Sequence, residues 1–305
     1  MIIQKINDIE FKMSEPCDFS FLEKHGKVFC AFDENDSGNI SFGTDNGQEK
    51  YFIKVAGAKT LNSGYKPDEA IQNLKNAVPV YKDLKHPNLV ELIDDYAAGN
   101  LYAAVFRWVD GECLHDHWNF EKYKKNPQMK SPKIRFKELP ALKRIDSFNI
   151  FFSFLIHTAS KGYIAVDFYD GSILYDFEKE RTAICDIDYF AKAPVINHMG
   201  DFWGTKRLKS PEEYILGAEI NEETNVYTLG ALIFHFFGEY TDDDIQQMYK
   251  NNCFFPCSPE KWELNERLYD TALKAVNNDR IKRYDSISDF FNAWNRYPNP
   301  SLKAF

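Results

Sequence analysis

The sequence predicts an α+β fold in two lobes: a small antiparallel β lobe with one helix, and a larger, mainly helical lobe. Two observations predict it. Residues 27–109 contain five β-rich runs with one helical pattern among them, and the pattern becomes mostly helical beyond Gly111. The length of 305 residues also exceeds one average domain. We therefore place the boundary near residues 106–111.

The first lobe is expected to be a sheet with one covering helix. Short runs of apolar and β-branched side chains alternate with turns rich in Asn, Asp and Gly. These expected strands are residues 27–33, 40–43, 50–55, 89–96 and 101–109. Residues 69–84 change to helical spacing after Pro67 and Asp68, which suit a helix start.

The second lobe is expected to be built from long helices and two short strands. The helices are expected at 139–161, 225–237, 264–276 and 286–297, and the strands at 172–175 and 182–185.

The apolar residues of the segment 1–26 are expected to pack on the small lobe. They are Ile2, Ile3, Ile6, Phe11, Phe19, Phe21 and Leu22.

Composition narrows the choice of partner and compartment. Hydrophobic residues make up 44% of the chain, which is typical of a globular protein with a core. A net charge of -9 disfavours nucleic acid or an anionic membrane as a partner. Neither a run of about 18 apolar residues nor a signal peptide is seen, so we expect a cytoplasmic protein whose six cysteines are free thiols.

One segment carries a local excess of positive charge. Residues 121–144 contain nine Lys or Arg against two acidic residues, with Pro127 and Pro132 among them. We interpret this segment as an exposed loop. It is either a solvated insertion or a contact for an acidic substrate or partner.

Three motifs in the second lobe stand in a characteristic order. Residues 204–212 read Gly-Thr-Lys-Arg-Leu-Lys-Ser-Pro-Glu, 225–230 read Asn-Val-Tyr-Thr-Leu-Gly, and 279–283 read Asp-Arg-Ile-Lys-Arg. They resemble the end of the activation segment and two later motifs of eukaryotic-type Ser/Thr protein kinases. The chain looks like a divergent, bacterial member.

The resemblance implies a two-lobed protein-kinase-like fold. An N-terminal extension, 1–26, would precede the N-lobe, 27–106, a hinge, 107–111, and the C-lobe, 112–300. It also implies a structural salt bridge between Glu212 and Arg283, which removal of either partner would break at a cost of several kcal/mol.

The same resemblance assigns the phosphate and metal chemistry. Lys54 is similar to the strand lysine that holds the ATP phosphates, and Asp167 to the catalytic aspartate that accepts the hydroxyl proton. Asp186 matches the aspartate that binds Mg²⁺. Ser172 and Asp188 stand where the family has Asn and Gly, and their oxygens would also suit that cation.

The remaining assignments depart further from the family pattern. Gly38 is the one glycine kept in the phosphate loop and Ile40 follows it; Phe106 would be the gatekeeper, with Arg107 and Val109 offering backbone groups to adenine. Glu69 is the nearest helix acid that could orient the strand lysine.

The catalytic loop departs from the family in its charged residues. Val166 replaces the arginine that reads a phosphate on the activation segment, which disfavours activation by that route. Tyr169 replaces the lysine two residues after the catalytic aspartate.

Three functions therefore stay open. The first is an ATP- and Mg²⁺-dependent phosphotransferase acting on a protein hydroxyl. The second is a pseudokinase that binds nucleotide or acts as a scaffold, which the altered glycine loop and Tyr169 favour. The third is a small-molecule kinase of related fold, which the pair Asp186 and Asp188 favours.

Overall fold

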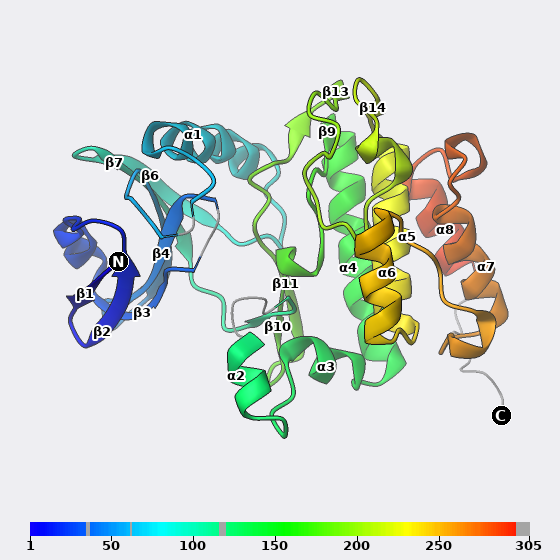
Figure 1. Cartoon of the computed structure of the whole chain (residues 1–305), viewed down its shortest axis with the longest axis horizontal. Coiled ribbons are helices and arrows are strands. Elements are labelled where there is room, and N and C mark those ends of the chain that lie inside the picture. Colours follow the sequence, from blue (N-terminus) through cyan, green and yellow to red (C-terminus); the bar gives the residue numbers. More distant parts are fainter. Residues whose placement is uncertain (35–36, 62, 116–119, 297–305) are drawn as a thin grey trace. The chain divides into compact units, whose positions relative to one another are not determined.

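The computed structural model describes residues 1–34, 37–61, 63–115 and 120–296 (Figure 1). It contains a five-stranded antiparallel sheet and several helices, so the predicted α+β class is confirmed. The chain divides into two compact units, Met1–Asp110 and Gly111–Phe305. Asn35, Asp36 and residues 297–300, which the sequence placed in a turn and at the end of the second lobe, lie outside the described residues.

The first unit is organised around an antiparallel sheet with the strand order β3-β4-β5-β7-β6. Its strands are β3 (Lys27–Phe32), β4 (Asn39–Asp45), β5 (Lys50–Ala56), β6 (Leu92–Ala98) and β7 (Leu101–Arg107). The middle strand β5 pairs with β4 on one side and β7 on the other. A residue on β5 is therefore held from both sides.

The segment before Lys27 covers one face of this sheet. It forms a hairpin, β1 (Ile2–Ile6) and β2 (Ile9–Met13), followed by a 3-10 helix at Ser20–His25. Its buried residues Phe11, Met13, Phe19 and Leu22 share one core with Ile40, Phe42, Ile53, Val55 and Val105 of the sheet. The expected packing of this segment on the first unit is found, except that Ile3 is 64% exposed.

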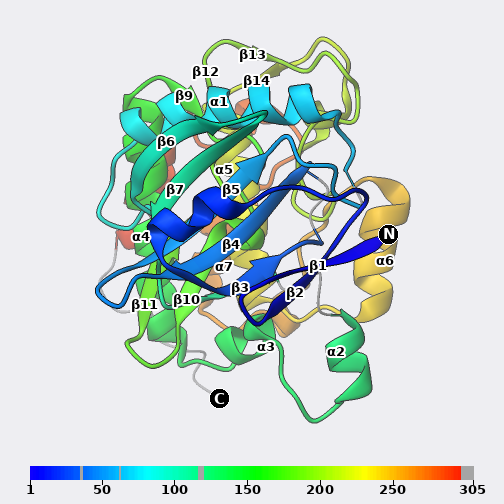
Figure 2. The same ribbon diagram turned by 90° about the vertical axis from the view of Figure 1, so that its left-hand side faces the viewer.

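Helix α1 (Pro67–Asp83) packs against β5, β6 and β7 (Figure 2). Its buried residues recur at helical spacing, including Ala70, Leu74 and Ala77. The ring of Tyr81 lies 4.8 Å from that of Phe106 on β7. Since Phe106 is not part of the core shared with the N-terminal segment, α1 lies on the other face of the sheet.

The second unit is mainly helical. Its helices are α2 (Phe120–Lys125), α3 (Pro132–Lys137), α4 (Ala141–Ser160), α5 (Glu222–Phe237), α6 (Asp242–Asn251), α7 (Glu266–Ala275) and α8 (Ile287–Asn295). Its short strands are β8 (Glu112–Cys113), β9 (Tyr163–Ile164), β10 (Ile173–Asp176), β11 (Arg181–Ile184), β12 (Ala191–Lys192), β13 (Val195–Ile196) and β14 (Glu219–Ile220). Among the described residues, no helix is long and apolar enough to cross a membrane.

Aromatic side chains fill the core of the second unit. Helix α5 is buried along almost its whole length and packs against α4, α7 and α8 (Figure 1). Phe148 and Phe152 of α4 and Phe234 and Phe237 of α5 are fully buried. Each such ring removes a large apolar area from water, so α5 forms a rigid support for the loops at its ends.

The basic segment is not the exposed loop that its charge indicated. It forms α2, α3 and the start of α4, and two of its cations bind the end of α5. Arg144 donates to the carbonyl of Phe236 at 2.7 Å and pairs with Glu263, while Lys137 donates to the carbonyl of Gly238 at 2.8 Å. Cations at a helix C-terminus satisfy its orphan carbonyls and oppose its dipole.

Candidate functional site

Two aspartates of the second unit have an unusual backbone. Asp167 has a φ of 60° and Asp186 a φ of 53°, in the left-handed region that side chains other than glycine rarely enter. Both follow a short strand, β9 and β11 respectively. Such conformations cost free energy and persist where the surrounding structure imposes them, which is frequent at functional sites.

Helix α5 holds the loop that carries Asp167. The side chain of Asn225 accepts a hydrogen bond from the Ala165 N–H at 2.8 Å and donates one to the Ala165 carbonyl at 2.9 Å. Asn225 and Ala165 are both buried, where backbone polar groups need hydrogen-bond partners. The side-chain amide of Asn225 supplies partners for both the N–H and the carbonyl of Ala165. Helix α5 therefore positions Asp167 by holding Ala165, which lies two residues before it on the same loop.

The loops of Asp167 and Asp186 are joined directly. The Cys185 N–H donates to the Ser172 carbonyl at 2.9 Å, and β10 pairs with β11 immediately beyond. In the sequence Asp186-Ile187-Asp188, Ile187 is fully buried while Asp186 is exposed and Asp188 is half-buried. The isoleucine thus anchors the loop, and the carboxylates stay accessible.

Ser172 lies inside the loop that carries Asp167. Its side chain is fully buried, and its hydroxyl lies 3.5 Å from the Asp167 carbonyl oxygen, at the limit of a hydrogen bond. In this structure the hydroxyl steadies the Asp167 loop.

Tyr169 and Gly171 depend on each other. A Cβ atom at Gly171 would lie 2.3 Å from Cζ of Tyr169, so the tyrosine ring folds over a position that only glycine can occupy. Burial raises the pKa of Tyr169, and the nearby charges of Asp167 and Asp186 raise it further, so the phenol stays protonated. The ring therefore takes up space next to both aspartates and offers a neutral hydroxyl.

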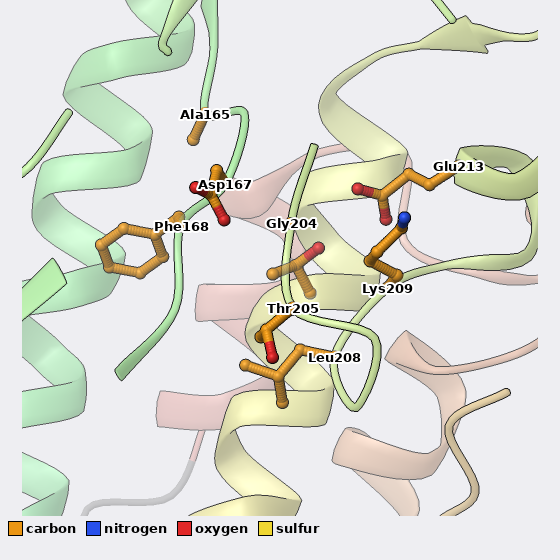
Figure 3. Close-up of a pocket in the computed structure, with 9 residues that line it drawn as sticks. Ala165, Asp167, Phe168, Gly204, Thr205, Leu208, Lys209 and Glu213 are labelled. Carbon is orange, nitrogen blue, oxygen red and sulfur yellow. The ribbon is translucent and has the colours of Figure 1, made fainter. Parts of the chain in front are cut away.

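A small pocket lies beside Asp167 in the second unit (Figure 3). It is lined by Ala165, Asp167, Phe168, Gly204, Thr205, Leu208, Lys209, Glu213 and Thr228. Figure 3 shows Asp167 on one side and Lys209 with Glu213 on the other, with Gly204 and Thr205 between them.

The cation in this pocket is already bound. The Lys209 side chain is buried and its amino group bonds to Asp201 and, at 2.6 Å, to the Phe202 carbonyl. Thr205 Oγ1 lies 3.4 Å from the Tyr249 hydroxyl. The pocket therefore brings together an acid, a hydroxyl and a held cation.

The predicted salt bridge is present in the second unit. Arg283 binds both oxygens of Glu212, with Nη1–Oε1 at 2.7 Å and Nη2–Oε2 at 2.9 Å. Thr224 of α5 also donates to Oε1 at 2.8 Å. Although burial opposes ionisation of Glu212, these contacts lower its pKa to about 2. The pair fixes the end of the 204–212 segment to α5.

In the first unit, Lys54 sits on the middle strand β5 and is only 7% exposed. Its register partners are Ser41 on β4 and Ala104 on β7. Ile40 lies one residue away from Ser41 and belongs to the core under the N-terminal segment. Alternation along a strand therefore places Ile40 on the face opposite to Lys54, and the structure does not bring the two side chains together.

Gly38 and Glu69 are both engaged near the start of α1. Gly38 has a φ of +76°, and a Cβ there would lie 2.7 Å from Ser63 Oγ and 3.1 Å from Ala70 Cβ. The carboxylate of Glu69 accepts a hydrogen bond from the Lys66 N–H at 3.0 Å. Glu69 is exposed and acts as part of the helix cap, which is a different role from the predicted orienting acid.

The predicted hinge residues continue from strand β7. Phe106 is buried against Tyr81. The Arg107 N–H donates to the Glu91 carbonyl at 2.9 Å, so only the Arg107 carbonyl could accept a bond from adenine. Its guanidinium binds Glu49 and Glu91 at the surface. Val109, half-buried, follows this strand.

Comparison with known proteins shows a distant similarity to a protein kinase. No protein-family model matches the chain. It is 24% identical over 216 residues to calcium-dependent protein kinase 5 of Plasmodium berghei (strain Anka). The match covers 67% of this chain, which spans about a third (34%) of that protein's length. The similarity supports a protein-kinase-like relationship and nothing narrower.

Sequence reasoning missed one group of buried charges in the second unit. Asp170 is fully buried and binds Arg207, and His235 of α5 lies beside both. A signal was present, because Asp170 is a charged residue in the stretch compared with the catalytic loop and Arg207 is one in the 204–212 motif. Nothing in the linear sequence indicated that they meet.

Proposed function

We propose that the chain is an ATP-dependent phosphotransferase related to Ser/Thr protein kinases. In this proposal the two units correspond to the two lobes of the kinase fold, and the γ-phosphate of ATP passes to a hydroxyl with Mg²⁺. The supporting observation is the pair Asp167 and Asp186, both in left-handed backbone conformations on loops joined by the Cys185–Ser172 bond.

The roles follow from the chemistry of each side chain. Asp167 would accept or orient the proton of the attacking hydroxyl, and Lys54, a buried cation, would hold the ATP phosphates. Adenine would contact Phe106 and the backbone of Arg107 and Val109.

The donors available fit a magnesium ion that shares its ligands with a nucleotide. Among the described residues, no group of three or more His, Cys, Asp or Glu could form a cage of protein ligands. Mg²⁺ in phosphotransferases usually needs one or two carboxylates besides phosphate oxygens and water. Asp186 and Asp188 would provide these, and Ser172 the weakest ligand. The bound ion would neutralise charge on the phosphates.

A protein hydroxyl is the substrate that we favour. The segment 204–212 keeps its ordered form, with Glu212 fixed by Arg283 and Ser210 donating to Glu213 through both its N–H, at 2.7 Å, and its hydroxyl. In kinases this stretch forms the platform for a peptide. A small-molecule hydroxyl, favoured by Asp188, is the alternative substrate.

The deciding experiment compares phosphotransfer from labelled ATP by the wild type, Asp167→Asn and Asp186→Ala. We expect both variants to lose at least about a hundredfold in kcat. Wild-type transfer that Asp167→Asn leaves unchanged would refute the role of Asp167. Glu180→Gln, a change at another residue with positive φ that lies on the surface, is a matched control and should retain full activity.

A pseudokinase is the second candidate, because Tyr169 occupies the place of a catalytic lysine and Glu69 caps its own helix. It predicts a rise in melting temperature with ATP and no phosphotransfer. If ATP shifts the melting temperature neither with nor without Mg²⁺, both nucleotide-binding functions are refuted.

A further inference from the structure

The second unit contains a buried group of charges that none of the proposed catalytic roles uses. Asp170 is 0% exposed and Arg207 is 4% exposed, and the guanidinium of Arg207 binds the carboxylate of Asp170. His235 Nε2 lies 3.4 Å from Asp170 Oδ2 and 3.4 Å from Arg207 Nη1. A buried ion pair needs close geometry to offset its desolvation, so these residues are fixed in place.

The three residues come from three separate elements. Asp170 lies three residues after Asp167 on the same loop, Arg207 belongs to the 204–212 segment, and His235 lies on α5. The contact therefore fastens the segment to the catalytic loop, and both to the buried helix that also holds Ala165 through Asn225.

Asp170 and Arg207 form an ion pair in which both side chains are charged. Although burial opposes ionisation, Arg207 and His235 hold the pKa of Asp170 well below its usual range. Burial and the charges of Lys133 and Arg207 lower the pKa of His235 well below its ordinary value, so the imidazole is neutral. His115 also approaches the carboxylate, with Nδ1 at 3.7 Å from Oδ2.

Between Asp186 and the 204–212 segment, the chain has no Ser or Thr that could carry a phosphate. Residues 187–203 contain no Ser and no Thr. Their single hydroxyl belongs to Tyr189, whose ring stacks on Trp203 at 5.0 Å. Val166 stands where an arginine would read a phosphate. The ion pair of Asp170 and Arg207, and not a phosphate, thus holds the 204–212 segment.

We infer that Arg207 and Asp170 are positioning residues that keep the 204–212 segment beside Asp167 without phosphorylation. The inference rests on the proposed function for its catalytic consequence, but the ordering of the segment does not. The unphosphorylated protein is then already in its competent conformation, and its activity is independent of any phosphate on residues 187–203.

Hydrogen exchange tests the ordering directly, on full-length protein that intact mass shows to be unphosphorylated. We expect peptides covering 195–214 to be protected in the wild type and to exchange at least about tenfold faster in Arg207→Met. Lys206→Met is the matched control, since this neighbouring cation binds Asp201 and Asn252 near the surface. It should leave exchange unchanged.

Peptides of α7 and α8 report whether the variant is folded. If Arg207→Met does not fold, the isosteric Asp170→Asn takes its place in the same comparison. An unprotected segment in the wild type would overturn the inference, and so would equal protection in wild type and a folded variant.

Activity then separates positioning from mere stability. We expect Arg207→Lys to keep part of kcat and Arg207→Met to lose about 10–100-fold, with the KM for ATP unchanged, and phosphatase treatment to have no effect on the wild type. Activity abolished by phosphatase would overturn the inference. A protected segment without any phosphotransfer would instead refute the proposed function and leave the ordering role intact.

Discussion

Two neighbouring glutamates are predicted to affect stability in opposite ways. Glu212 is ionised against Arg283, and its pKa is lowered to about 2. Burial raises the pKa of Glu213 to about 7, although Ser210 and Lys209 partly oppose this. The perturbation is the same conservative substitution at each position, Glu212→Gln and Glu213→Gln.

The sign of each effect follows from proton linkage. A carboxyl group whose pKa is raised on folding stabilises fully below its unfolded value near 4.5, and this contribution is lost as pH rises towards 7. The loss between pH 5 and pH 8 is about 2–3 kcal/mol. Glu213→Gln has no carboxyl group to titrate at this position. The free energy of unfolding of this variant, relative to the wild type, should therefore rise by that amount from pH 5 to pH 8.

Glu212 gives the opposite result over the same range. Its contribution is present above pH 4.5 and is lost only as pH falls towards 2. Glu212→Gln therefore leaves Arg283 buried without its anion and should cost about 3–5 kcal/mol at every pH from 5 to 8. The two variants act as controls for each other.

Thermal melting at pH 5, 6, 7 and 8 measures both effects. One kcal/mol corresponds to about 2–4 °C for a unit of this size, so Glu213→Gln should gain about 5–10 °C on the wild type between pH 5 and pH 8. A difference between Glu213→Gln and wild type that stays flat with pH would refute the reasoning. A sloping difference for Glu212→Gln would refute it equally.

Three further predictions concern packing. Gly171→Ala should displace the Tyr169 ring and lower kcat about tenfold, and Gly171→Ala/Tyr169→Ala should recover the melting temperature that the single change loses. Arg144→Met should destabilise by about 3–5 kcal/mol in urea unfolding because it leaves the Phe236 and Leu139 carbonyls and Glu263 without their cation; an unchanged midpoint would contradict this. Phe11→Ala should cost about 3–5 kcal/mol and Ile3→Ala less than about 0.5 kcal/mol, so equal losses in melting would contradict the core assignment.

The fold class was predictable because the hydrophobic period is mostly that of strands before residue 110 and mostly that of helices after it. Strands β3 to β7 and helices α4, α5, α7 and α8 have apolar patterns that are strong enough to read without tertiary information. The basic segment was misread because charge alone does not distinguish a solvated loop from residues that bind the carbonyls at a helix end.

The motifs predicted single candidate positions, and they also predicted the contact between Glu212 and Arg283, but they did not predict which other distant side chains meet. Asp167, Asp186 and the partners Glu212 and Arg283 lie in motifs of fixed spacing. Which face of a strand Ile40 occupies depended on the N-terminal hairpin packing against it, a tertiary contact that no local pattern encodes.

The N-terminal hairpin also sets how long the folding unit must be. The motifs begin at β3, but four of the thirteen buried residues of this core, Phe11, Met13, Phe19 and Leu22, precede Lys27. Removing residues 1–26 would expose Phe42, Ile53 and Val55 on one broad apolar face, the kind of surface that promotes aggregation. A fragment that begins at Lys27 would keep all of the motifs but is expected to be insoluble. The shortest soluble fragment is therefore expected to include residues 1–26 as well.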